Sequence, residues 1–149
     1  MDNLLEVKGL KKYFPIKGGF FGKTVNNLKA VNDISFSIKR GETLGIAGES
    51  GCGKSTAGRA ILRLHEPTAG KIYFEDQEIT ALDKESLRKK RREMQFIYQD
   101  PYSSLNPRMT VGDIIGEPFE VYESMSSKDK MDKVKELLNM VGLSPYHVR

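Results

Sequence analysis

The sequence predicts an α/β fold with an antiparallel β portion in its first half and helices in its second half. Three observations support this prediction. The apolar segment at 43–47 runs into a glycine-rich loop, and apolar residues at helical spacing follow that loop. Residues 34–38 alternate between apolar and polar, and an amphipathic stripe begins near Ser127. A length of 149 residues favours a single domain.

The first elements are predicted from hydrophobic patterns and turn residues. Apolar positions between Leu4 and Leu10 predict a strand, and 15–23, PIKGGFFGK, reads as a loop inserted after it. The alternation at 34–38 predicts a strand with one buried face, and the RGE sequence at 40–42 turns the chain. The next segment, TLGIA at 43–47, is apolar at successive positions, so we expect a strand that is covered on both faces.

The later elements follow from the same patterns. We expect a helix of about three turns from Lys54, ended by Pro67, and a strand at 95–99 after a charged helix. Residues 71–75 with Ile79 predict a short hairpin. The last helix begins after a cap at Ser126 or Ser127 and is closed by Gly142.

Composition excludes several classes of protein. The single cysteine, Cys52, allows no intramolecular disulfide, and no segment has the roughly 20 apolar residues that span a bilayer. We therefore expect a cytoplasmic chain whose membrane association goes through a partner. The five basic residues at 88–92 are expected to form a solvated helix face, because a helix spreads such a run around its axis. We predict no direct contact with nucleic acid.

The segment from Gly48 to Ser55 matches the pattern G-x-x-x-x-G-K-[ST], between an apolar segment and a helix. Glycines let consecutive backbone N–H groups turn toward phosphate oxygens, and the helix adds the positive end of its dipole. Lys54 is predicted to reach the β and γ phosphates of ATP, Ser55 to bind Mg²⁺, and Thr56 to donate to the α phosphate. We read Cys52 as a small space-filling residue of the loop without a redox role.

Beyond this motif, the sequence resembles the ATP-binding cassette (ABC) family, and most closely the ATPase subunits of oligopeptide and dipeptide transporters. The resemblance lies in LKAVNDISFSIKRGETLGIAGESGCGKST at 28–56 and in QFIYQDPYSSLNPRMTVGDIIGEP at 95–118. It implies a P-loop NTPase core with an antiparallel β subdomain at 1–99, and the start of a helical subdomain at 100–149. By the same resemblance, Gln99 contacts the Mg²⁺ site, and an aromatic residue, Phe14 or its neighbour Tyr13, stacks on adenine.

The resemblance also implies partners and a second half. Members of the family work as dimers, here homo- or heterodimers, on transmembrane permease subunits at the inner face of the cell membrane, and a peptide-binding protein delivers the cargo. LSGGQ, an Asp-Glu pair and a late histidine do not occur in this sequence. We therefore expect a truncated cassette that binds ATP without efficient hydrolysis. The predicted catalytic residues are Lys54 and Gln99, the predicted metal ligands are Ser55 and Gln99, and the predicted cofactor-binding residues are Phe14, Tyr13, Gly48, Ser50, Gly51, Cys52, Gly53, Lys54, Ser55 and Thr56.

Two other readings stay open. An ABC-type ATPase that acts on nucleic acid or ribosomes would share the same loop, although DPYSSLNPRMT at 100–110 argues against it. A P-loop kinase or GTPase is the other alternative. A GTPase would carry the guanine-reading sequence N-K-x-D, which does not occur here.

Overall fold

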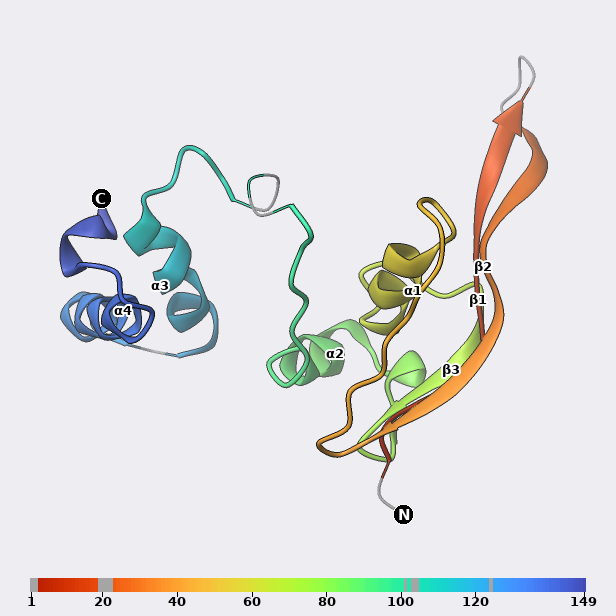
Figure 1. Ribbon diagram of the computed structural model, residues 1–149, viewed down its shortest axis with the longest axis horizontal. Helices are drawn as coiled ribbons and strands as arrows, with labels where there is room; N and C mark the ends of the chain where they lie inside the picture. Colours follow the sequence, from red (N-terminus) through yellow and green to blue (C-terminus); the bar gives the residue numbers. More distant parts are fainter. Residues whose placement is uncertain (1–2, 19–22, 101, 103–104, 124) are drawn as a thin grey trace. The chain divides into compact units, whose positions relative to one another are not determined.

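The computed structural model describes residues 3–18, 23–100, 102, 105–123 and 125–149 (Figure 1). The chain forms two compact units rather than one, Met1–Phe96 and Ile97–Arg149. The first unit contains a sheet and two α-helices, and the second unit is helical.

The first unit is organised around an antiparallel sheet with strand order β2-β1-β3-β4. The strands are β1 (Asn3–Gly18), β2 (Lys23–Lys39), β3 (Ala69–Phe74) and β4 (Gln77–Glu78). In Figure 1, β1 and β2 form one long hairpin with β3 beside β1. The strand predicted at 4–10 is thus longer than expected, because residues 15–18 continue β1 where a loop was predicted. Residues 19–22 of the predicted loop lie outside the described residues.

The predicted β3–β4 hairpin is confirmed. Glu75 and Asp76 connect its strands, and both have positive φ, 48° and 62°, as a two-residue hairpin turn requires. Ile79 begins a 3₁₀ turn, η1 (Ile79–Ala81), instead of continuing the strand, and its side chain is fully buried.

Helix α1 (Lys54–Ile61) begins where the sequence predicts and is about two turns long, not three. It ends before Pro67 because Leu62 and Arg63 leave the helical conformation. Its buried face joins the sheet in one core. The buried members of this core are Val7, Leu10, Val31, Ala57, Ala60, Ile72, Phe74, Ile79 and Met94.

The prediction that residues 88–92 form a solvated helix face is wrong for two of the five residues. The side chain of Lys90, at the end of α2 (Lys84–Lys90), is 14% exposed and donates to Glu75 and Glu93. Arg91 donates to the carbonyl oxygen of Arg63. A hydrogen bond from Arg40 and a weaker contribution from Lys90 hold the pKa of Glu75 below its usual range. Lys90 and Arg91 are therefore structural contacts of the first unit.

Two predicted strands are absent. Residues 43–47 and 95–99 are irregular, and Leu44, Ile46 and Ile97 are 41%, 51% and 94% exposed. A strand needs a hydrogen-bonded neighbour as well as apolar side chains. No described strand pairs with either segment, so these three apolar residues face solvent.

The second unit contains α3 (Val111–Tyr122), α4 (Ser127–Met140) and a 3₁₀ turn, η3 (Pro145–Val148). Helix α4 confirms the predicted last helix, because the Ser126 side chain caps it and Gly142, with φ 76°, follows its end. Val134 and Leu138 are its buried residues. Within the described ranges, no helix is long and apolar enough to cross a membrane.

Candidate nucleotide site

The glycine loop at 48–53 leads directly into α1, and its conformation depends on its glycines. Gly48, Gly51 and Gly53 have φ values of 157°, 80° and 102°. A Cβ on Gly48 would lie 2.7 Å from Cys52 Sγ, and one on Gly53 would overlap the carbonyl oxygen of Ala30 in β2. Side chains are therefore excluded at both ends of the loop, as a close-packed phosphate-binding loop requires.

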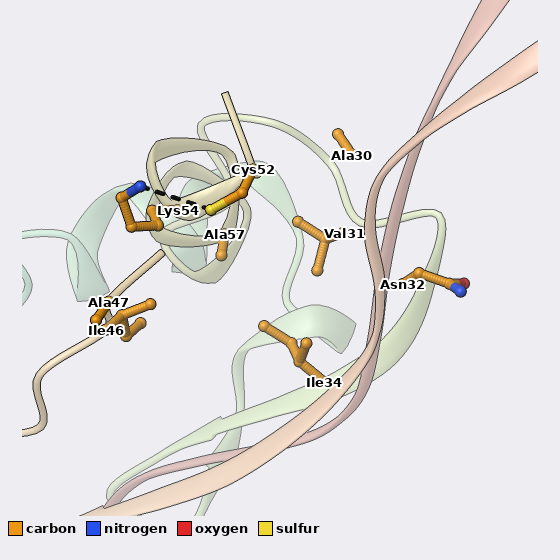
Figure 2. A pocket seen from close by; sticks show the side chains of 10 residues that line it. Ala30, Val31, Asn32, Ile34, Ile46, Ala47, Cys52, Lys54 and Ala57 are labelled. Carbon is orange, nitrogen blue, oxygen red and sulfur yellow. Dashed lines mark hydrogen bonds between the residues drawn. The ribbon is translucent and has the colours of Figure 1, made fainter. Parts of the chain in front are cut away.

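The Lys54 ammonium lies inside the curve of this loop. Its Nζ donates to the carbonyl oxygens of Gly48 and Glu49, both at 2.7 Å, and lies 3.5 Å from Cys52 Sγ (Figure 2). These partners are two carbonyl groups and a thiol, and they take up the three N–H donors of the ammonium. A bound phosphate would replace them as the partner of the ammonium, because its charged oxygens are stronger acceptors.

The start of α1 adds a second positive element. Its N-cap is Gly53, which offers no side-chain hydrogen bond, and its first turn contains no acidic residue. The N–H groups of such a turn and the helix dipole favour an anion. Ser55, on this turn, is exposed. A hydroxyl suits Mg²⁺, which binds few protein ligands and keeps oxygen ligands from phosphate and water. The described residues contain no cluster of three or more His, Cys, Asp or Glu side chains for a metal.

A cavity of about 220 Å³ lies between β2, residues 46–47 and the start of α1 (Figure 2). Val31, Ile34, Ile46 and Ala57 give it a largely apolar lining. It is smaller than typical sites for drug-sized ligands, which begin near about 300 Å³. Because residues 48–52 are exposed, the loop itself is a better candidate for a triphosphate than this cavity.

An irregularity in the β1–β2 hairpin brings β2 against the loop. The register passes from Lys12–Val31 to Tyr13–Lys29, which leaves Ala30 as an extra residue in β2. Ala30 is the residue whose carbonyl oxygen touches Gly53. Phe14 pairs with Leu28, two residues from Ala30 and thus about 7 Å along the strand. The glycine loop thus meets the hairpin at Ala30, two residues along β2 from the partner of Phe14.

Phe14 and Tyr13 point to opposite faces of this hairpin. Lys12 Nζ lies 4.8 Å from the centre of the Phe14 ring, and the partner of Lys12, Val31, points into the cavity (Figure 2). Tyr13 donates its hydroxyl to Asn32 Oδ1 at 2.6 Å, and the Asn32 side chain points away from the cavity. The face on the α1 side therefore holds Phe14, which also makes an edge contact with His65 after α1.

The predicted site residues fall into both units. The loop residues, Phe14 and Tyr13 belong to the first unit, whereas Gln99 belongs to the second, at an exposed bend near its beginning. The role of Gln99 at the Mg²⁺ site stays a prediction. Sequence patterns missed Leu28, Ala30 and His65 because their positions depend on strand pairing and on contacts distant in sequence.

An ammonium inside a glycine loop at the start of a helix, beside an antiparallel sheet, is the arrangement expected of a nucleotide-binding α/β protein. The family model described as ABC transporter matches residues 31–149. The chain belongs to this family, which confirms the resemblance in the sequence.

Similar curated proteins and solved structures agree with this family assignment. The chain is 52% identical over 145 residues to the oligopeptide transport ATP-binding protein AppF of Bacillus subtilis, covering 97% of the chain and 44% of AppF. It is 42% identical over 140 residues to the dipeptide transport ATP-binding protein DppF of Haemophilus influenzae, covering 94% of the chain and 42% of DppF. A dimeric ATP-binding cassette in a post-hydrolysis state bound to ADP and Pi is similar with a TM-score of 0.78 and 28% identity, covering 97% of this chain and 60% of that one. The chain thus spans less than half the length of these two curated relatives.

Proposed function

We propose that this chain is the ATP-binding part of a subunit that powers membrane transport of oligopeptides or dipeptides by hydrolysing ATP. The observation that carries the proposal is the Lys54 ammonium inside the glycine loop of a chain that belongs to the ABC transporter family. The cargo is proposed from relatives named for oligopeptide and dipeptide transport.

The proposed site assigns a task to each group. Backbone N–H groups of residues 48–53 and Lys54 bind the β and γ phosphates, and Thr56 donates to the α phosphate. Ser55 and Gln99 hold Mg²⁺, which neutralises charge between the β and γ phosphates when bound. Phe14 stacks on adenine, and its side of the hairpin favours it over Tyr13.

The proposed assembly is a dimer of cassettes at the cytoplasmic face of the membrane. A dimeric ATP-binding cassette among the similar structures supports a second ATPase subunit as partner. Membership of the ABC transporter family supports membrane subunits as partners. We propose permease subunits in this role, with a peptide-binding protein as an indirect partner.

A titration of the chain with ATP-Mg tests the phosphate site. Lys54→Ala should weaken ATP binding about 10- to 100-fold, because it removes hydrogen bonds to charged oxygens. Lys84→Ala, on the exposed start of α2, is the control and should bind as the unchanged chain does. Equal affinity in Lys54→Ala and the unchanged chain would contradict the proposal.

A second prediction concerns turnover. The 149-residue chain should bind ATP and release phosphate at most slowly, since LSGGQ and the Asp-Glu pair do not occur in it. Phosphate release from the purified chain is the measurement, with Lys54→Ala as the background. Steady hydrolysis at the rate of an intact cassette would refute this prediction.

A further inference from the structure

Arg63 adopts a backbone conformation that side chains rarely accept. It follows Leu62, the C-cap of α1, and has φ +50°, in the left-handed region that favours glycine. This is the conformation of a helix C-terminus, closed by hydrogen bonds from Arg63 N–H to Ala60 and from Leu64 N–H to Arg59, but here an arginine stands where glycine is usual.

The contacts that hold Arg63 come from three directions. Its side chain is 12% exposed, and Nη1 donates to the carbonyl oxygens of Ile79 at 2.9 Å and Leu82 at 2.7 Å. Nε and Nη2 donate to the two carboxylate oxygens of Glu66, at 3.0 and 3.1 Å. The Arg63 carbonyl oxygen accepts from Arg91 Nη2 at 2.7 Å. The planar guanidinium makes four hydrogen bonds at once, which a lysine cannot reproduce.

Residues 65–68 connect this cluster to β1. His65 makes its edge contact with Phe14 at 5.6 Å between ring centres, with an interplanar angle of 89°. The Glu66 carbonyl oxygen accepts from Lys12 Nζ at 2.8 Å, and Lys12 Nζ in turn lies over the Phe14 ring. Thr68 exchanges two hydrogen bonds of 2.8 Å with β1, from its N–H to Lys11 and from Tyr13 N–H to its hydroxyl.

We propose that Arg63 is a positioning residue for the base of ATP. Arg63 acts through residues 65–68, which hold the ring of Phe14 in place. The inference rests on the proposed function, in which Phe14 stacks on adenine. Arg63 itself touches no part of the predicted phosphate site. It fixes Glu66 and the turn after α1, and these hold His65 and Lys12 against the ring.

The test compares two ligands in the 149-residue chain, ATP-Mg and inorganic tripolyphosphate with Mg²⁺, which has phosphates and no base. Arg63→Lys should weaken ATP binding about 5-fold or more, because base stacking on an aromatic ring is worth about that much or more. Its affinity for tripolyphosphate should equal that of the unchanged chain. Arg88→Lys, on the exposed face of α2, is the matched control and should change neither affinity.

A double-variant comparison separates positioning from general stability. In a Phe14→Ala background, Arg63→Lys should cause no further loss of ATP affinity. If Arg63→Lys does not fold, Glu66→Gln is the alternative variant, because it changes the partner of the guanidinium. It should also lower the affinity for ATP and leave the affinity for tripolyphosphate unchanged. An equal fall for both ligands, a full additional loss in the Phe14→Ala background, or unchanged ATP affinity would overturn the role of Arg63.

Failure of the proposed function gives a different result. In that case Lys54→Ala leaves binding of both ligands unchanged, or Phe14→Ala leaves ATP affinity unchanged. Either outcome removes the site on which Arg63 would act, and so overturns the positioning role together with the proposed function.

Discussion

At the scale of single residues, Gly53 is a position of the glycine loop at which the backbone of another element, as well as its own backbone conformation, excludes a side chain. It has φ 102°, and an added Cβ would overlap the Ala30 carbonyl oxygen. Gly41, in the turn after β2, has a comparable φ of 76° but nothing within 4 Å of an added Cβ. Alanine substitutions at the two glycines therefore distinguish destabilisation by backbone strain from destabilisation by steric overlap.

Gly53→Ala should lower the free energy of unfolding by more than Gly41→Ala, for which about 1 to 2 kcal/mol is expected from strain alone. The excess reflects the overlap with β2, and ATP affinity should fall only in Gly53→Ala. Urea unfolding and an ATP titration of both variants are the measurements. Equal destabilisation in the two would mean that the loop moves freely away from β2.

At this scale, the sequence predicts the role of a residue when the residues that determine this role lie close to it in the chain. The glycines and Lys54 lie in one continuous motif, so the pattern of letters alone was enough to recognise them. Arg63 could not be recognised in this way, because three of its partners, Ile79, Leu82 and Arg91, are 16, 19 and 28 residues away. Contacts distant in sequence also explain why the prediction of a solvated helix face is wrong for Lys90 and Arg91.

At the scale of elements, the sequence predicts helices with local end signals and the strands of the sheet, but not that residues 43–47 and 95–99 are irregular. Helix α4 has an apolar stripe, a serine cap and a closing glycine, all within one stretch of sequence. Residues 43–47 have the composition of a buried strand, yet no described strand pairs with them. Apolar composition predicts that a segment seeks burial, and pairing decides whether it becomes a strand.

The cap of α4 offers a test between two neighbouring serines. Ser126 accepts a hydrogen bond from Asp129 N–H, whereas Ser127 is the first residue of the helix. Ser126→Ala should lower the free energy of unfolding by about 1 kcal/mol, and Ser127→Ala should leave it nearly unchanged or raise it. Thermal unfolding of both variants is the measurement, and the reverse order would place the cap at Ser127.

At the scale of the whole molecule, the segment 43–47 is an exposed apolar surface of the first unit. Leu44 and Ile46 are 41% and 51% exposed in a stretch that pairs with no described strand. Segments of this kind recruit further strands. The curated relatives are more than twice as long as this chain, and we propose that other parts of such a protein cover the segment.

The chain should therefore self-associate as its concentration rises. Replacing Leu44 and Ile46 with serine should reduce association, because the apolar side chains that favour pairing are removed. Met140→Ser is the control, since Met140 is 75% exposed on a helix whose backbone is already hydrogen-bonded. Sedimentation velocity over a range of concentrations is the measurement, and a monomer at every concentration would count against this prediction.

The extra residue at Ala30 also matters to anyone who redesigns the hairpin. Deleting it would restore regular pairing between Lys12 and Tyr13, at one of the irregular positions of the β1–β2 ladder. The same deletion would remove the carbonyl group on which Gly53 rests. A more regular hairpin would then pack less well against the glycine loop, because the loop packs against the residue that is left unpaired in β2.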